Sequence, residues 1–179
     1  SIYLLTNAMM TPIYGKLADK IGRKPIFLIG IIIFIIGSAL SGMSQNMIQL
    51  IIFRAIQGIG AGSIVPVSLV IIADLYPVEK RASILGLNSA AWGIASIVGP
   101  LAGGFIVDAF SWHWIFLINV PIGLVLMLLV WLYLNEEKRV VEKAPIDYLG
   151  SFLLMLMLLS LLYGFQTMSE GFGVVTIVS

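Results

Sequence analysis

The fold is decided by the stretch Gly15-Lys16-Leu17-Ala18-Asp19-Lys20-Ile21-Gly22-Arg23-Lys24 and by the uncharged apolar run 26–43 that follows Pro25. As an α-helix rising about 1.5 Å per residue, that run is long enough to cross the roughly 30 Å hydrocarbon core of a bilayer. Basic residues concentrate in the cytoplasmic loops of membrane proteins. The stretch therefore predicts a cytoplasmic loop followed by a transmembrane helix, with Pro25 at the helix start, where a missing N–H costs no hydrogen bond.

The other basic residues repeat this arrangement. Apart from Arg54, every Lys and Arg lies in one of three segments, and the breaks at 44–47, 108–113 and 168–172 contain none. The segments hold Lys16, Lys20, Arg23 and Lys24, then Lys80 and Arg81, then Lys138, Arg139 and Lys143. We therefore expect loops 15–25, 74–83 and 135–148 to be cytoplasmic in a multi-pass protein of the cell membrane.

The composition indicates the same class. Hydrophobic residues make up 60% and charged residues 11% of the chain, and its mean hydropathy is +1.07. Soluble domains carry about 25% charged residues. The apolar runs are too long for the alternating segments of roughly 10 residues that build a membrane β-barrel. We expect an all-α, polytopic helical membrane protein with complete spans at 26–43, 48–72, 84–107, 114–134 and 149–165.

Both ends of the sequence are apolar. The first residue is Ser1, and the run 2–13 is too short to cross the hydrocarbon core. The run 174–179 is again apolar and stops after a few residues. We expect a window from a longer protein, and the N-terminus lacks the charged start and small-residue site of a cleaved signal peptide.

Several classes of chemistry are disfavoured. With no cysteine and one histidine, neither a disulfide framework nor a metal site nor a cofactor is expected. The basic residues are divided among loops rather than gathered in a groove, so no nucleic-acid partner is expected. The sequence lacks a Walker A motif, which disfavours an ATP-driven pump. His113, with Asp108 and Ser111 in the same outer break, is a weak catalytic pattern, so we expect an interfacial histidine and not an enzyme.

Arg54 is a basic residue inside an apolar run. It lies about eight residues into the expected span 48–72, roughly 12 Å from the outer surface at 1.5 Å per residue. A charge at that depth costs about 2.5–3.5 kcal/mol on insertion scales and faces a cavity or a partner, unless the side chain reaches back to the headgroups. Gln57 and Ala61 follow at helical spacing, so one face of this helix is predicted to be polar or small.

The expected span 84–107 carries a stripe of small residues. The stripe consists of Gly86, Ser89, Gly93, Ser96, Pro100 and Gly103, at steps of three and four. Such a stripe lets another helix approach closely, either for ordinary packing or at an interface that moves. Pro100 removes a backbone hydrogen bond in mid-membrane and predicts a bend.

The basic loop resembles a signature of the major facilitator superfamily of transporters. By themselves, its two glycines permit tight turns at both ends of a short connection. It is similar to the loop between spans two and three, matching at Gly15, Leu17, Ala18, Asp19, Gly22, Arg23 and Lys24. The resemblance implies a cytoplasmic latch in which Asp19 helps to hold the two halves together in the outward-open state. The alternative is an ordinary basic loop with an incidental acid.

Two further motifs agree with this resemblance. The run 54–62 resembles the fourth-span motif of these transporters, in which the arginine is implicated in proton coupling, so the resemblance assigns that role to Arg54. The residues that resemble the antiporter motif, which is associated with export, are Gly93, Gly99, Pro100, Gly103 and Gly104.

The segment 111–123 resembles the fourteen-span drug:proton antiporters of the superfamily, although His113 stands where an arginine is commoner. The short connection before Asp147 agrees with that subfamily, which has two extra helices between its six-helix bundles. The resemblance runs from the end of span 2 to the start of span 8. It places residues 1–134 in the N-terminal bundle (spans 2–6), 135–148 in a cytoplasmic loop and 149–179 in the extra central helices.

The resemblance implies a proton-coupled secondary transporter that exports drugs or other amphipathic small molecules by alternating access. Its expected partners are a small-molecule substrate, protons and membrane lipid, and it is expected to work as a monomer. The alternatives are a symporter or uptake carrier of the same fold and a non-transporting membrane sensor or scaffold. The insertion cost of Arg54 argues against the scaffold. Substrate-binding residues are not marked in the sequence, because polyspecific pockets are defined by shape and by scattered polar groups.

Overall fold

The computed structural model describes residues 2–134 and single helical positions at 150, 153, 156, 157, 160, 161 and 164, and this part of the chain is all-α. Its helices are α1 (Ile2–Ile21), α2 (Arg23–Gly42), α3 (Met47–Leu75), α4 (Val78–Ala109), α5 (Trp114–Leu117) and α6 (Asn119–Tyr133). The expected loop 135–148, the span 149–165 as an element and the run 174–179 lie outside the described residues.

Within the described residues, four stretches are long and apolar enough to cross a membrane. They are α2, α3, α4 and the combined stretch Trp114–Tyr133, which contains α5 and α6. Ile118 separates α5 from α6, and its φ of −62° and ψ of −25° are helical, so the two pieces continue in one direction. The expected spans 26–43, 48–72, 84–107 and 114–134 are therefore confirmed as helices.

The helices extend further than the hydrophobic runs did, so the expectation of loops at 15–25 and 74–83 is wrong for most of those residues. α1 continues to Ile21 and α2 starts at Arg23, which leaves Gly22 as the break between them. Gly15 lies inside α1, so the turn expected there is also wrong, whereas Gly22 has a φ of 115°, a conformation that favours glycine. Charged residues mark where a helix leaves the hydrocarbon, and good helix formers such as Lys, Leu and Ala continue the helix beyond that point.

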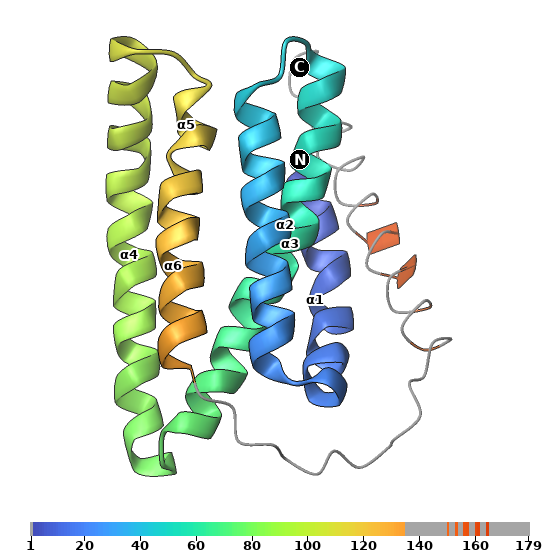
Figure 1. Ribbon diagram of the computed structural model, residues 1–179, viewed down its shortest axis with the longest axis vertical. Helices are drawn as coiled ribbons and strands as arrows, with labels where there is room; N and C mark the ends of the chain where they lie inside the picture. Colours follow the sequence, from blue (N-terminus) through green and yellow to red (C-terminus); the bar gives the residue numbers. More distant parts are fainter. Residues whose placement is uncertain are drawn as a thin grey trace, which may run out of the picture.

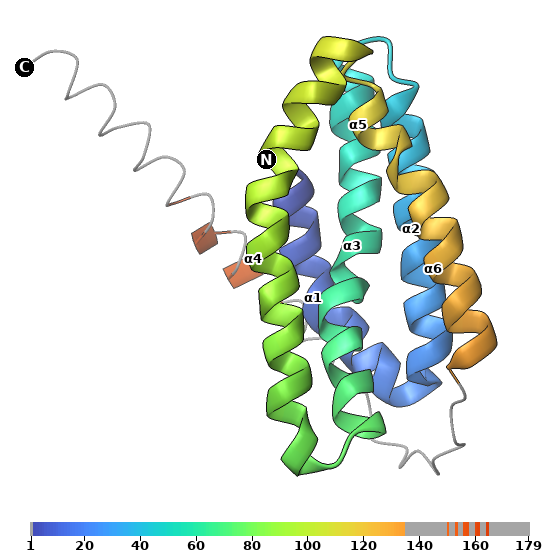
Figure 2. The same cartoon turned by 90° about the vertical axis from the view of Figure 1, so that its left-hand side faces the viewer.

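Figure 1 shows α1, α2 and α3 packed side by side, with α6 against α2. α4 contacts α3 and α5 but not α6, and the turned view of Figure 2 places α4 and α6 on opposite sides. The α1–α2 and α3–α4 connections lie at the lower end of Figure 1, and the α2–α3 and α4–α5 connections lie at the upper end. The first two basic segments therefore lie at the same end of the bundle.

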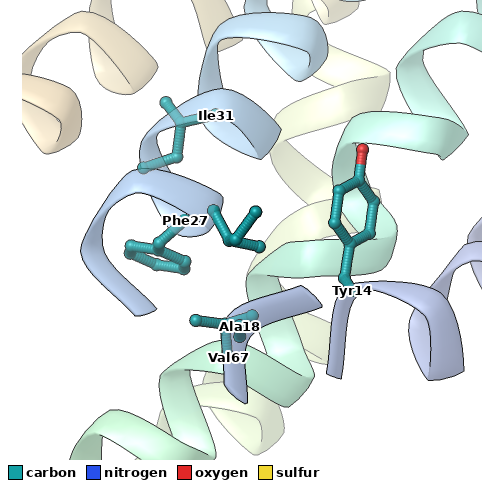
Figure 3. Close-up of a cluster of buried hydrophobic side chains, with 6 residues drawn as sticks. Tyr14, Ala18, Phe27, Ile31 and Val67 are labelled. Carbon is teal, nitrogen blue, oxygen red and sulfur yellow. The ribbon is translucent and has the colours of Figure 1, made fainter. Parts of the chain in front are cut away.

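The buried apolar cluster lies where α1, α2 and α3 meet (Figure 3). Its members are Tyr14 and Ala18 of α1, Ile26, Phe27 and Ile31 of α2, and Val67 of α3. Pro25 occupies the first turn of α2, as expected, because the N–H groups of that turn have no partner within the helix. This cluster holds the three helices together near the end of the bundle that carries the first two basic segments.

α3 approaches its two neighbours through glycines. A Cβ added to Gly58 would lie 2.5 Å from the carbonyl oxygen of Tyr3 in α1, and one added to Gly60 would lie 2.3 Å from the backbone nitrogen of Phe34 in α2. Gly62, one turn beyond Gly58, faces α1 again, with its added Cβ 2.7 Å from that of Met10. Small residues at this spacing let helix backbones meet closely in lipid.

Candidate functional site

The charged group in the membrane-spanning part of the described chain is Arg54, on the second turn of α3. Asn46 begins this helix, since its side-chain oxygen accepts a hydrogen bond from the backbone N–H of Gln49 at 2.9 Å. The guanidinium of Arg54 lies 4.5 Å from the ring centroid of Tyr3 and 5.2 Å from that of Phe116. A cation over aromatic faces at these distances is attracted by the ring quadrupoles. Arg54 therefore faces neighbouring helices, as the depth of the residue predicted.

Gln57, one turn after Arg54, connects this charge to the interior. Its Oε1 accepts a hydrogen bond from Arg54 Nη1 at 2.8 Å, and its Nε2 donates to Ser38 Oγ at 2.9 Å. The Gln57 side chain is buried, with 2% of the residue exposed. Burial leaves no water to replace either bond, so both are needed to satisfy the amide.

Ser38 of α2 extends the chain of hydrogen bonds to the α5–α6 stretch. Its hydroxyl donates to the carbonyl oxygen of Phe116 at 2.9 Å and accepts from Asn119 Nδ2 at 3.2 Å. Asn119 Nδ2 also lies 3.2 Å from the carbonyl oxygen of Ile115. We call Arg54, Gln57, Ser38 and Asn119 the Arg54 network. It joins α2, α3 and the α5–α6 stretch, and within the described part of the chain no buried side-chain nitrogen or oxygen lacks a partner.

Sequence reasoning identified Arg54 and the helical spacing of Gln57 but missed Ser38 and Asn119. The signal was available, because a hydroxyl and an amide inside apolar spans are unusual and commonly bond across helices. What the sequence did not provide was the register of α2 and α6 against α3.

The residues of the expected latch lie at the end of the bundle that holds the α1–α2 and α3–α4 connections. Arg23, at the start of α2, forms an ion pair with Asp74 near the end of α3. Lys24 donates from Nζ to the carbonyl oxygen of Trp131 at 2.9 Å, close to the end of α6. Asp19 is exposed on the last turn of α1. The arginine of the loop is thus paired to an acid that the sequence analysis did not select, and Asp19 presents its carboxylate at the surface.

A second basic residue closes the other connection at this end. Arg81, in the first turn of α4, donates from Nε to the carbonyl oxygen of Tyr76 at 3.0 Å and from Nη2 to that of Ala73. Cations near a helix C-terminus satisfy its free carbonyls and its negative dipole end. Lys24 and Arg81 therefore occupy the C-terminal ends of α6 and α3.

The stripe on α4 lies on an open surface. A Cβ added at Gly86, Gly93, Gly99, Gly103 or Gly104 would meet nothing within 4 Å among the described residues. α4 has no buried residue and continues as a helix through Pro100. The close helix approach predicted for the stripe is therefore not made by any described helix, whereas α3 makes such approaches at Gly58, Gly60 and Gly62.

His113 joins the α4–α5 connection to the α2–α3 connection. Its Nδ1 is 2.8 Å from Ser111 Oγ, its Nε2 is 3.3 Å from the carbonyl oxygen of Ser44, and its ring stacks on Trp112 at 3.7 Å. Within the described residues, these contacts link the two connections through polar and aromatic groups, and the interfacial position of His113 stays a prediction. In the described ranges, no three His, Cys, Asp or Glu side chains come together as a metal site.

The all-α bundle and its motifs have a counterpart among known families. A sequence profile described as the Major Facilitator Superfamily matches residues 1–179. The chain belongs to the major facilitator superfamily. The fold class was therefore predicted correctly: the chain is part of a polytopic helical membrane protein of that superfamily.

Several multidrug proteins are similar to this member of the superfamily. Multidrug resistance protein 3 of Bacillus subtilis is 46% identical over 164 residues, which are 92% of this chain and 32% of the relative. Multidrug transporter protein MdtP of the same organism is 42% identical over 162 residues, covering 89% and 29% of the two chains. Multidrug export protein EmrB of Haemophilus influenzae is 41% identical over 152 residues, covering 85% and 30%. The chain thus spans about a third of the length of these relatives.

In this superfamily member, the charge of Arg54 can act electrostatically on other groups while Arg54 keeps its own proton. An arginine guanidinium stays charged in proteins, so it cannot carry a proton on and off. A fixed charge that is partly shielded from water acts more strongly on a nearby titrating or charged group than the same charge in bulk water. The network also connects the Arg54 guanidinium to α2, α3 and the α5–α6 stretch, so the relative positions of these helices determine where the charge lies.

Proposed function

We propose that the chain forms most of the N-terminal bundle of a proton-coupled multidrug exporter that works by alternating access. The observation that carries this proposal is the Arg54 guanidinium, held between Tyr3 and Phe116 and bonded to buried Gln57. A scaffold has no use for a charge that costs about 2.5–3.5 kcal/mol to insert. The multidrug names of similar proteins support drugs or other amphipathic molecules as substrates.

Arg54 supplies the fixed charge in this proposal, and a carboxylate elsewhere in the transporter supplies the proton site. The acids in the described residues are Asp19, Asp74, Glu79 and Asp108, and all lie near helix ends. None is therefore placed to titrate in mid-membrane. A carboxylate that approaches Arg54 loses its proton more readily, because the guanidinium favours its charged form. Movement of the bundle would then couple proton release to exposure of the substrate site.

The cytoplasmic end is assigned to the latch. In this proposal, segments 15–25, 74–83 and 135–148 face the cytoplasm, residues 1–134 hold spans 2–6, and 149–179 belong to extra central helices. Arg23 and Asp74 tie α2 to α3 within the bundle. Asp19 is exposed, so its carboxylate is accessible to the other half of the transporter. A helix N-terminus or an arginine of that half would bind it.

The open face of α4 is assigned to the interface with the other half of the transporter. Gly93, Gly99, Gly103 and Gly104 leave space for a second helix along one side of α4. Two helices packed this closely can slide or rock against each other while lipid stays excluded from between them. We propose that the transporter acts as a monomer, surrounded by lipid, with a small molecule and protons as its ligands and no nucleic acid or cofactor.

The direct test uses the full-length transporter in inside-out vesicles with an imposed proton gradient. Addition of a cationic drug should dissipate the gradient in the wild-type protein and not in Arg54→Ala, with both proteins present in equal amounts in the membrane. Drug accumulation driven by the gradient should be lost in parallel. Uptake in the opposite direction would identify a symporter, and drug flux without proton movement would contradict the coupling assigned here.

A further inference from the structure

We propose that Ser38 and Asn119 are positioning residues, which orient the Gln57 amide so that its carbonyl oxygen faces Arg54. The inference rests on the proposed role of Arg54 in proton coupling and extends it to α2 and α6. Neither residue contacts the guanidinium. Both act through the amide of Gln57, which bonds Arg54 on one side and Ser38 on the other.

The argument starts from the hydroxyl of Ser38, whose hydrogen-bonding capacity is fully used. A serine hydroxyl has one proton to donate and two lone pairs to accept with. The proton goes to the carbonyl oxygen of Phe116, and the lone pairs receive Gln57 Nε2 and Asn119 Nδ2. Because the proton is already placed, the hydroxyl can serve Gln57 only as an acceptor.

That restriction fixes the amide. A glutamine side chain presents an acceptor oxygen on one side and a donor NH₂ on the other, and rotating it by half a turn exchanges them. In the observed orientation Nε2 meets the Ser38 acceptor and Oε1 meets the Arg54 donor. In the reverse orientation an NH₂ group would face the guanidinium, which has only donors, and Oε1 would face a hydroxyl without a free proton. Both contacts would be lost in a site closed to water.

The α5–α6 stretch holds the Ser38 proton in place. The ring of Phe116 lies over Arg54 while its carbonyl oxygen accepts from Ser38, so one residue contacts the network on both sides of Gln57. Asn119 lies on the following turn and bonds Ser38 together with the carbonyl oxygen of Ile115. If α5–α6 moves away, Ser38 recovers its proton, Gln57 can turn, and the hold on Arg54 weakens. The position of α5–α6 thereby determines how firmly the Arg54 guanidinium is held.

Ser38→Ala tests the role of the hydroxyl, and the chain offers a matched control. Ser41 is also a fully buried serine of α2, but its hydroxyl donates to the carbonyl oxygen of Gly37 in its own helix. In the full-length transporter, Ser38→Ala should lower the maximal rate of drug-dependent proton flux about tenfold, with the KM for drug changed less than about twofold. Ser41→Ala should leave both unchanged, and Ser38→Thr, which keeps the hydroxyl, should recover most of the rate.

The pH profile separates orientation from simple structural support. Tyr3 is the titratable side chain beside Arg54 within the described residues, and the proton-binding carboxylate is placed elsewhere in the transporter. A loosely held guanidinium favours the ionised carboxylate less, so that the group keeps its proton at higher pH. The profile of Ser38→Ala should therefore shift to higher pH, in the same direction as any residual activity of Arg54→Ala.

Gln57→Glu provides a second, independent comparison. Both oxygens of a carboxylate accept, so Glu at this position can hold Arg54 in either orientation. In that background Ser38→Ala should cost less than it does with Gln57 present. Asn119→Ala removes the weaker of the two donors to Ser38 and should lower the rate about two- to threefold. That variant keeps the inference testable if Ser38→Ala does not fold.

The outcomes distinguish this inference from the proposed function. If the wild-type transporter shows no drug-dependent proton flux, or if Arg54→Ala retains it, the proposed function fails. If both of those controls behave as expected but Ser38→Ala matches Ser41→Ala, or loses the same factor beside Gln57→Glu, the positioning role is overturned and the proposed function stands.

Discussion

Gly60 of α3 lies against Phe34 of α2 so closely that an added Cβ would sit 2.3 Å from the Phe34 backbone nitrogen. The same Cβ would be 2.6 Å from the carbonyl oxygen of Gly30. Both neighbours are backbone atoms of a packed helix, which cannot turn aside as a flexible side chain can. The contact between α2 and α3 therefore depends on the absence of a side chain at this position.

Gly60→Ala should destabilise the bundle by about 1–3 kcal/mol, because the added methyl forces two helices apart. The matched control is Gly86→Ala on α4, where the methyl would meet nothing within 4 Å. That change should be neutral or slightly stabilising, since Ala is the better helix former. Thermal unfolding in detergent measures both. Equal melting temperatures for the two variants would contradict the close approach at Gly60.

The stripe on α4 leads to a different expectation for Gly103→Leu. The bulky side chain has open space in this bundle, so membrane insertion and the folded amount should remain near wild type. In the full-length transporter we expect a loss of turnover of more than about tenfold with a smaller effect on drug binding, because the stripe is proposed to meet the other half. Transport at the wild-type rate would mean that this face of α4 contacts lipid.

Labelling of single cysteines can determine the topology, and the 179 residues contain no native cysteine that would interfere. Single cysteines at Lys20 and Lys80 should be protected from an impermeant thiol reagent in intact cells and should react once the membrane is opened. A cysteine at Gln45, in the exposed α2–α3 connection, should react from outside. In Figure 1 the α1–α2 and α3–α4 connections, next to Lys20 and Lys80, lie at one end of the bundle, and the α2–α3 connection lies at the other. Reaction of both groups in intact cells would exclude the assigned orientation.

Arg54→Lys separates the charge from its geometry. Lysine keeps a positive charge but loses the planar group that bonds Gln57 and lies over the rings of Tyr3 and Phe116. We expect partial recovery of drug-dependent proton flux, above Arg54→Ala and below wild type. The flux is measured with a pH-sensitive dye in vesicles of matched protein content. Full recovery would show that a point charge is sufficient at this position.

The sequence predicted the centres of the described spans and the position of Arg54 against neighbouring helices, because both follow from the cost of placing charge in hydrocarbon. It did not predict where the helices end, since most of the charged segment 15–25 is helical and not a loop. Nor did it predict that Arg23 pairs with Asp74 or that Ser38 bonds Gln57, because these contacts depend on the register between helices. The glycines of α3 were visible as small residues, but only the packed bundle shows that they, and not the α4 stripe, make the close contacts.

The latch is tested by comparing two acids that the structure places differently. Asp74 is bonded to Arg23 within the bundle, whereas Asp19 is exposed on α1 and is assigned to the other half. Asp19→Asn keeps the size of the side chain and removes its charge, so it should leave the stability of the bundle unchanged. In the full-length transporter it should shift the population toward the inward-open state by a modest amount, because such a charge interaction is worth roughly 0.3–2 kcal/mol. Asp74→Asn should instead loosen the α2–α3 corner and lower the melting temperature.

Accessibility of a single cysteine at Gly15, followed with and without drug, reports the population of the inward-open state. If Asp19→Asn changes neither that accessibility nor export, Asp19 is an ordinary surface acid, and if it lowers stability as Asp74→Asn does, its contact lies within this bundle.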